Sequence, residues 1–256
     1  MKKIILTIAF IALSVSCTDD ITGLNQDTKN PTTTKAEFLF TNAQKAIVDQ
    51  MVSTSVNINV YRLFVQHWTE TTYPDESQYD ITTRNIPANT YGALYRDGLK
   101  DLKEAQTLLN AEAPIATTDI AILNNKKAIV DIMMVYAYNV LVDTFGDVPY
   151  SEALDLEAHP LPKYDDAETI YKDLLARLAT DVSLISSNDN FGDADLIYGG
   201  DAMKWKKFAN SLRLRIAVNM HDVDPTFAAT HITAAVASGT ISSNDDNTNL
   251  HYLDTS

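Results

Sequence analysis

Residues 138–154 read YNVLVDTFGDVPYSEAL, and this stretch joins the most apolar segment of the chain to an abrupt turn. Upstream of the turn, residues 119–145 place apolar side chains around nearly the whole circumference of a helix. That pattern predicts a helix buried in the centre of a helical array. We expect it to end at Gly146, which tolerates a tight helix exit, and we expect Pro149 to fix the turn that follows.

A membrane-spanning helix is the competing interpretation of residues 119–145. Lys126, Lys127, Asp131 and Asp143 fall inside the segment, and charged side chains make insertion into a bilayer costly. The buried core helix is therefore the favoured interpretation.

Apolar residues spaced by three and four predict further helices on both sides of the central one. These helices are expected at residues 35–57, 91–111, 165–185, 201–220 and 225–237, with a further one containing Phe64 and Trp68. Asp165 and Glu168 have the spacing of a capping box, and Asp201 is the expected cap of the helix after it. The fold class is therefore all-α, with long polar loops at residues 69–90 and 186–200 and a polar tail without a closing element.

The N-terminus has the layout of an exported bacterial lipoprotein. Residues 1–16 carry two lysines before a short apolar run, as in a signal peptide, and the run is too short to cross a bilayer. Cys17, the only cysteine, follows directly and is the expected lipidation site. The alternative is a chance cysteine in an ordinary signal peptide, because the residues before Cys17 match a lipoprotein processing site imperfectly. Residues 17–34 then predict an acidic tether.

Composition argues against nucleic acid as a partner and gives no support to catalysis. The formal net charge is −14, and an acidic surface repels phosphate backbones. The sequence holds no GxSxG, HExxH, CxxC or phosphate-binding glycine loop, and its five histidines lack metal-ligand spacing. We therefore expect no catalytic residue, no metal and no cofactor; a surface hydrolase is motivated only by the abundant carboxylates.

Three segments of the chain resemble the SusD/RagB family, in its SusD-like branch. They are Tyr138–Leu154, Tyr164–Tyr171, and Asp195–Asp201 followed by Lys204–Arg215. The resemblance implies a scaffold of tetratricopeptide-like helix pairs over residues 35–256, which caps a TonB-dependent β-barrel transporter of the SusC type. Members of the family are usually much longer, so the chain is expected to be the N-terminal half of such a protein, with its C-terminal half missing.

The resemblance also implies a location and a cargo. The acidic pair Asp19 and Asp20 behind Cys17 is similar to the export signal of surface lipoproteins, which favours the outer membrane and its exterior face. The implied function is to bind an oligomeric nutrient, a glycan or a peptide, and to deliver it to the transporter. The alternative is an envelope scaffold lipoprotein that binds proteins but no nutrient.

The loop at residues 69–90 is where ligand contact is expected in this half of the protein. Trp68, Tyr73 and Tyr79 offer rings on which sugar faces stack, and Gln78 offers an amide for sugar hydroxyls. The alternative is that these rings pack against neighbouring helices or the barrel partner. We also expect Arg213 or Arg215 to pair with the acidic segment 143–147, the alternative for both being a solvated surface position.

Overall fold

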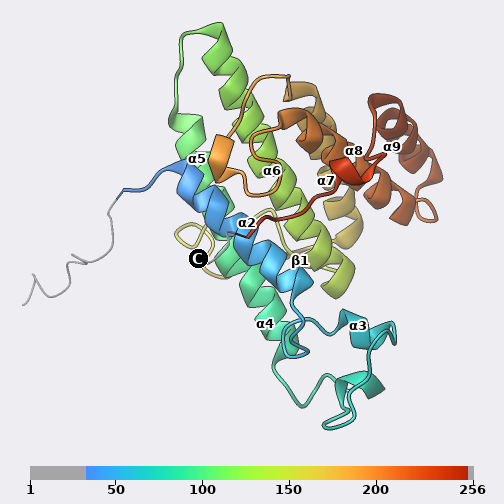
Figure 1. Cartoon of the computed structure of the whole chain (residues 1–256). Helices are drawn as coiled ribbons and strands as arrows, with labels where there is room; N and C mark the ends of the chain where they lie inside the picture. The colour runs from blue at the N-terminus through green and yellow to red at the C-terminus, as the bar shows by residue number, and fades with distance from the viewer. Residues whose placement is uncertain (1–32, 253–256) are drawn as a thin grey trace, which may run out of the picture. The chain divides into compact units, whose positions relative to one another are not determined.

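The computed structural model describes residues 33–252, which form an array of helices (Figure 1). The elements are α2 Ala36–Val52, α3 Tyr61–Phe64, η2 Glu76–Gln78, α4 Ile86–Gly92, the π-helical η3 Ala93–Leu99, α5 Lys100–Ala111, α6 Thr117–Phe145, β1 Val148–Pro149, β2 Tyr164–Asp165, α7 Ala167–Leu184, η4 Gly192–Ala194, α8 Ala202–Asn219, α9 Pro225–Ser238 and η5 Asn244–Asp246. The all-α prediction is confirmed. The expected signal peptide at 1–16, Cys17 and nearly all of the tether at 17–34 lie outside the described residues.

Helix α6 is the centre of the array. Its apolar side chains are buried on most sides, and it packs against α5, α7 and α8. Among the helices of residues 33–252, α6 is the one long and apolar enough to cross a membrane, yet 72% of its most apolar window is buried inside the protein. The prediction of a buried central helix is confirmed. Gly146 ends α6 with a φ of 74°, a conformation that costs a side-chain-bearing residue more than glycine.

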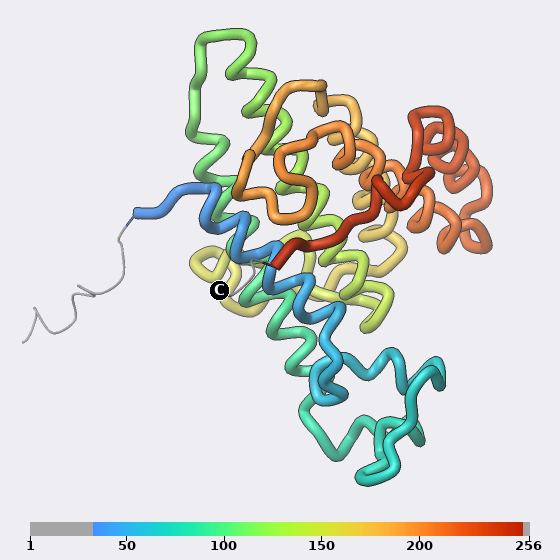
Figure 2. Tube along the Cα trace, viewed as in Figure 1, coloured from blue at the N-terminus to red at the C-terminus, as the bar shows by residue number. Residues whose placement is uncertain are grey.

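Helices that follow one another in the sequence also pack against one another. The α2 helix lies against η3 and α5, α5 against α6, α6 against α7, α7 against α8, and α8 against α9 (Figure 2). Each helix buries its apolar face on the next. Only the α5–α6 and α8–α9 connections are short, at residues 112–116 and 220–224, whereas the others carry the loops of the protein. The result is a row of helix pairs.

Two of the predicted helix starts differ in their details. Asp201 caps α8 as expected, accepting hydrogen bonds from the N–H groups of Met203 and Lys204. The predicted cap of α7 is wrong by one residue, because Asp166 caps that helix by accepting from Thr169. Asp165 instead lies in β2, which pairs antiparallel with β1.

The C-terminal segment packs back onto the array. The Tyr198 hydroxyl donates to the Asp246 carbonyl at 2.9 Å, and the His251 N–H donates to the Leu196 carbonyl at 2.9 Å. In the core, the fully buried Trp205 donates through its indole N–H to the Asp195 carboxylate at 2.7 Å. The polar tail was expected to add no closing element, and the structure shows the short η5 and these contacts.

The remaining sequence predictions that differ from the structure concern two helices and two arginines. The helix expected at residues 35–57 ends at Val52. The helix expected around Phe64 ends at that residue, so Trp68 lies in a loop. Neither arginine pairs with segment 143–147: Arg213 donates to His231 Nδ1 at 3.0 Å, and Arg215 donates to the Asn139 amide oxygen.

Candidate functional site

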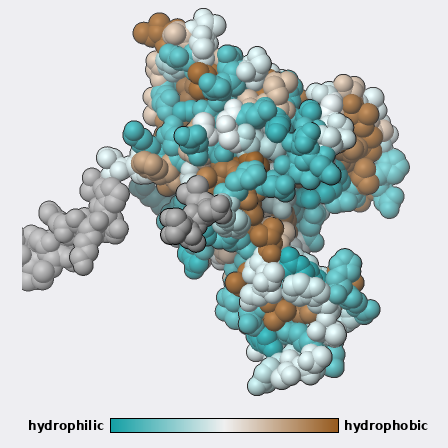
Figure 3. Space-filling model, viewed as in Figure 1, coloured by the Kyte–Doolittle hydropathy of each residue, from teal (hydrophilic) through white to brown (hydrophobic). Residues whose placement is uncertain are grey.

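A loop formed by residues 65–85, between α3 and α4, extends from one end of the helical body. We call it the aromatic loop. Figure 1 shows it as the blue-green segment beyond the ends of α2 and α4, and Figure 3 shows it as a separate lobe with a mixed polar and apolar surface. All four residues predicted to contact a ligand belong to it.

The three predicted rings of the aromatic loop face solvent. Trp68 is 44% exposed, Tyr73 72% and Tyr79 57%, and Gln78 is also exposed. Single exposed apolar residues are common on protein surfaces, but three exposed rings on one loop offer a group of apolar faces that a ligand or partner can cover. Tyr79 also packs against Phe64 of α3, with the ring centres 5.8 Å apart, so this ring is only partly free of the neighbouring helix.

Two of the rings are held in place by contacts with α3 and within the loop. The Tyr79 hydroxyl donates to the Phe64 carbonyl at 3.1 Å and accepts from the Gln66 amide at 3.1 Å. The guanidinium of Arg62 lies 5.0 Å from the centre of the Trp68 ring, within cation–π range. The loop thus presents its rings from fixed positions, although none of the three stacks on another in the part of the chain that the structure describes.

Three non-glycine residues of the loop have left-handed backbone conformations. The φ angles are 56° at Gln66, 58° at Tyr73 and 64° at Tyr79. Such conformations cost free energy and persist where the surroundings impose them, often at binding sites. Two of the three are predicted contact residues, so the strain coincides with the exposed rings.

A buried ionic cluster supports the aromatic loop from inside. Glu76 is fully buried, and its carboxylate lies 3.2 Å from the Arg84 guanidinium, which also donates to the Asn57 side chain at 2.7 Å. Burial and the neighbouring Glu76 carboxylate raise the pKa of Glu70. The cluster connects two parts of the loop: Glu70 lies before η2, and Arg84 lies just before α4.

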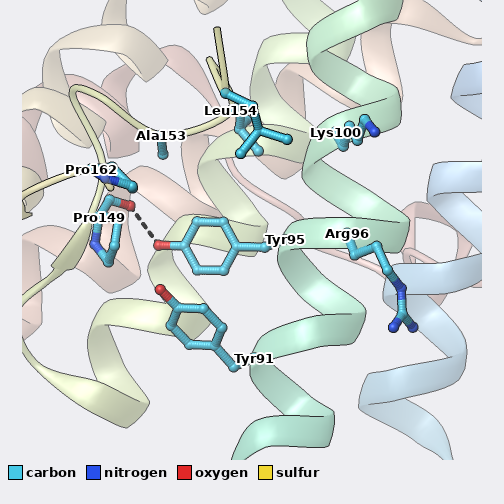
Figure 4. Close-up of a pocket in the computed structure, with 9 residues that line it drawn as sticks. Tyr91, Tyr95, Arg96, Lys100, Pro149, Ala153, Leu154 and Pro162 are labelled. Carbon is cyan, nitrogen blue, oxygen red and sulfur yellow. Dashed lines mark hydrogen bonds between the residues drawn. The ribbon is translucent and has the colours of Figure 1, made fainter. Parts of the chain in front are cut away.

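A second hollowed region, which we call the tyrosine groove, lies between α4, η3 and α5 on one side and residues 149–162 on the other. Its first part is a cavity of about 320 Å³ with mainly aromatic and aliphatic walls. Figure 4 shows the rings of Tyr91 and Tyr95 facing Pro149 and Pro162, with Leu154 and Ala153 opposite. The two rings lie 4.5 Å apart, and the Tyr95 hydroxyl donates to the Pro149 carbonyl.

The second part of the tyrosine groove is a polar cavity of about 270 Å³ that shares Ala153 and Leu154 with the first. Arg177 forms a bidentate pair with Asp131 at 2.6 and 3.0 Å, and also donates to the Tyr150 hydroxyl at 2.7 Å. Burial raises the pKa of Tyr150 despite the nearby Arg177 charge. Arg177, Asp131 and Tyr150 are thus held as oriented, paired or neutral groups in the wall of the polar cavity.

Residues 150–163, which cover the tyrosine groove, are fixed at their base by Asp165. Its carboxylate accepts from the N–H groups of Ser151 at 2.7 Å and Tyr150 at 3.1 Å. Burial alone would raise the pKa of Asp165, but these hydrogen bonds hold it below its usual value. Asp165, which was expected to cap α7, therefore anchors residues 150–163 over the tyrosine groove.

The sequence analysis missed the tyrosine groove. Tyr91 and Tyr95 fit the helical spacing of their segment, so they looked like core residues. Only the fold places residues 149–162 against them. In residues 33–252 the structure shows no group of three or more His, Cys, Asp or Glu side chains able to hold a metal ion.

The fold defines a tetratricopeptide-like helical protein with an exposed aromatic loop. A family model described as SusD-like, "Starch-binding associating with outer membrane", matches residues 28–256. The chain belongs to this SusD-like family, as the resemblance of its motifs had implied. A comparison with curated proteins gives no match.

Several solved structures share the fold. A chitin-binding protein is 28% identical with a TM-score of 0.68, over 84% of this chain and 45% of the other. A chitin-binding SusD homologue from Flavobacterium johnsoniae is 23% identical with a TM-score of 0.62, over 82% and 45%. A SusD homologue from Parabacteroides distasonis is 22% identical with a TM-score of 0.65, over 84% and 41%. The chain spans less than half the length of these structures.

Proposed function

We propose that this protein binds an oligomeric nutrient, a glycan, through the aromatic loop and performs no chemistry on it. The observation that carries the proposal is the set of three exposed rings, Trp68, Tyr73 and Tyr79, on a loop braced by its own hydrogen bonds and ionic cluster. Pyranose rings present apolar C–H faces that pack on aromatic rings. The exposed Gln78 amide supplies a donor and an acceptor for hydroxyl groups beside them.

Similar proteins support a glycan as the ligand. Two of the solved structures that share the fold are described as chitin-binding, and the family description names starch. These ligands differ, but both are neutral polymers of pyranose sugars. A peptide ligand is the alternative cargo, and an envelope scaffold without any nutrient is the alternative function.

We further propose that Cys17 carries a lipid that holds the protein on the exterior face of the outer membrane. There it delivers the glycan to a SusC-like TonB-dependent barrel. Support comes from the lipoprotein-like N-terminus and from the outer-membrane association in the family description. Recovery of such a barrel with the tagged native protein from mildly solubilised outer membranes, identified by mass spectrometry, tests the delivery step.

Calorimetric titration of the purified protein with chito-oligosaccharides and malto-oligosaccharides tests the binding proposal. We expect saturable binding to one of these series, and an affinity about tenfold weaker in Trp68→Ala, which corresponds to about 1.4 kcal/mol. Tyr73→Ala and Tyr79→Ala should weaken binding in the same direction. The last variant also loses two hydrogen bonds, so its circular dichroism should be checked first.

Phe38→Ala is the matched control, because Phe38 is a similarly exposed ring on α2, outside the loop. It should bind the glycan as the wild type does. If the protein bound peptides but no glycan, the cargo would be a peptide and the glycan proposal would be wrong. Co-purification with envelope proteins, together with no affinity for either ligand, would favour the scaffold function.

A further inference from the structure

We propose that the tyrosine groove is a second, separate saccharide site, which accepts an oligosaccharide bearing carboxylate groups. A sugar ring would lie against Tyr91 and Tyr95 in the apolar cavity, and its carboxylate would face the lysines of α5. This proposal does not depend on glycan binding by the aromatic loop, which lies at the far end of α4 (Figure 1).

Size and wall chemistry suit a short sugar chain. Pockets for small ligands commonly measure from about 300 Å³ upward and combine apolar walls with a few oriented polar groups. The apolar cavity and the adjoining polar one meet at Ala153 and Leu154, so a ligand can occupy both. Tyr138 and Tyr150, whose rings lie 4.7 Å apart, continue the aromatic lining into the polar cavity.

Cationic side chains follow the groove along its helical wall. Arg96 and Lys100 line the apolar cavity and Lys103 lines the polar one, at spacings of four and three residues along η3 and α5. Arg96 pairs with Asp97, whereas the ammonium groups of Lys100 and Lys103 form no ion pair with any residue in 33–252. In a chain of net charge −14, a row of cations beside a cavity favours an anionic ligand.

The acidic group inside the groove does not oppose such a ligand. Asp131 lines the polar cavity, but both of its oxygens accept from Arg177. The Gln106 amide also donates to Asp131, at 3.4 Å. The charge of Asp131 is therefore compensated within the wall, which leaves Lys103 as the unpaired charge of the cavity.

Backbone conformation adds an independent observation. Leu154, shared by both cavities, has a φ of 66°, and the wall opposite is the π-helical segment η3. Left-handed non-glycine residues and π-helical turns are both frequent at functional sites. Here they face each other across one groove.

Titration of the purified protein with short oligogalacturonides tests the proposal. We expect saturable binding that weakens as salt is raised, and an affinity about tenfold weaker in Lys103→Glu, since one charge-assisted contact becomes a repulsion. Lys103 is exposed on α5, so the variant should fold, and its circular dichroism should match that of the wild type. Lys35→Glu, an equal charge change at an exposed position before α2, should leave the affinity unchanged.

Two further ligands make the assignment specific. Neutral galacto-oligosaccharides of the same length should bind at least tenfold more weakly than the oligogalacturonides, and oligoglutamate peptides should not compete with them. Equal affinity of the wild type and Lys103→Glu would show that the ligand does not bind in the tyrosine groove. Effective competition by oligoglutamate would show that the groove binds anionic chains in general and has no preference for a saccharide. Trp68→Ala should retain oligogalacturonide binding, so failure at one site is distinguishable from failure at the other.

Discussion

The carboxyl group of Asp181 is buried between α6 and α7, beside Asp131 and its partner Arg177. Asp181 is only 4% exposed, and one of its oxygens has no hydrogen-bond partner in the described part of the chain. Burial and the neighbouring Asp131 charge raise the pKa of Asp181 to about 9, although Arg177 acts in the opposite direction. Asp181 therefore carries a proton at neutral pH.

This proton makes stability depend on pH. In the unfolded chain an aspartate titrates near pH 4, so the folded state binds the proton more tightly. The resulting stabilisation is complete below about pH 4 and declines as the pH rises towards 9. Asp181→Asn keeps a donor without a titrating group. When the pH is raised from 5 to 8, the free energy of unfolding of the wild type should fall by about 1–3 kcal/mol more than that of the variant, as measured by urea denaturation.

The exposed Asp193→Asn is the control for this comparison, because Asp193 lies at the surface in η4. Its stability should follow the pH dependence of the wild type. If Asp181→Asn also gave a curve parallel to that of the wild type, the proton would not be on Asp181.

Single residues were predicted from the sequence with uneven success, and their surroundings explain why. Asp201 was predicted correctly, since a cap depends only on the three residues after it. Arg215 was not, because its partner Asn139 comes from α6 and is 76 positions away. Turn-forming neighbours placed the rings of Tyr73 and Tyr79 in a loop, whereas Trp68 was wrongly assigned to a helix with Phe64. The exposure of all three rings required the structure.

At the scale of elements, α2 and η3 approach each other closely at Gly98. A Cβ atom added to Gly98 would lie 2.7 Å from Cγ1 of Ile47, a residue that is fully buried. The absence of a side chain at Gly98 therefore lets the two helices touch. Helix contacts of this kind transmit strain, because a packed interior has little free volume.

Gly98→Ala should lower the free energy of unfolding by about 1–3 kcal/mol, since Ile47 must move against a filled core. Gly92→Ala is the matched substitution, because nothing lies within 4 Å of its added Cβ atom. It should be neutral, or stabilise the helix by up to about 1 kcal/mol. Chemical denaturation of both variants measures the difference, and equal stabilities would show that Ile47 adjusts freely.

The helices themselves were predictable because their apolar spacing is long and regular. Residues 119–145 became α6 with a change of two residues at one end, and residues 225–237 became α9 with one added residue. The two-stranded ribbon of β1 and β2 was not predicted, since each strand has two residues and carries no periodic signal. For the same reason the sequence did not indicate that residues 149–162 form one wall of a groove.

At the scale of the whole molecule, the helical array separates two surfaces with different chemistry. The aromatic loop extends beyond one end of the helices (Figure 1), whereas the tyrosine groove is lined by residues of α4, η3, α5 and the segment 149–162. Binding at one site therefore does not exclude binding at the other. A mixed polysaccharide with neutral and carboxylated stretches could engage both, with a gain in avidity if its length matches the separation.

Attachment of the molecule to the membrane is tested by Cys17→Ala. Lipid chains on a single cysteine supply the hydrophobic area needed for stable anchoring, so the variant should move from the membrane fraction to the soluble envelope fraction. It should also lose incorporation of labelled palmitate, whereas Thr18→Ala should keep both properties. A Cys17→Ala protein that stayed with the membrane would show that another contact holds it there.

The two tryptophans of the chain lie in opposite environments, and this gives the protein an optical readout of its own. Trp205 is fully buried beside Asp195, whereas Trp68 is exposed on the aromatic loop. Indole emission shifts to longer wavelength in water, so Trp68 should emit at a longer wavelength than Trp205. Acrylamide should quench Trp68 first. A saccharide that stacks on the loop would shield Trp68 from the quencher. In the same sample, the shorter-wavelength emission of Trp205 reports that the fold is intact.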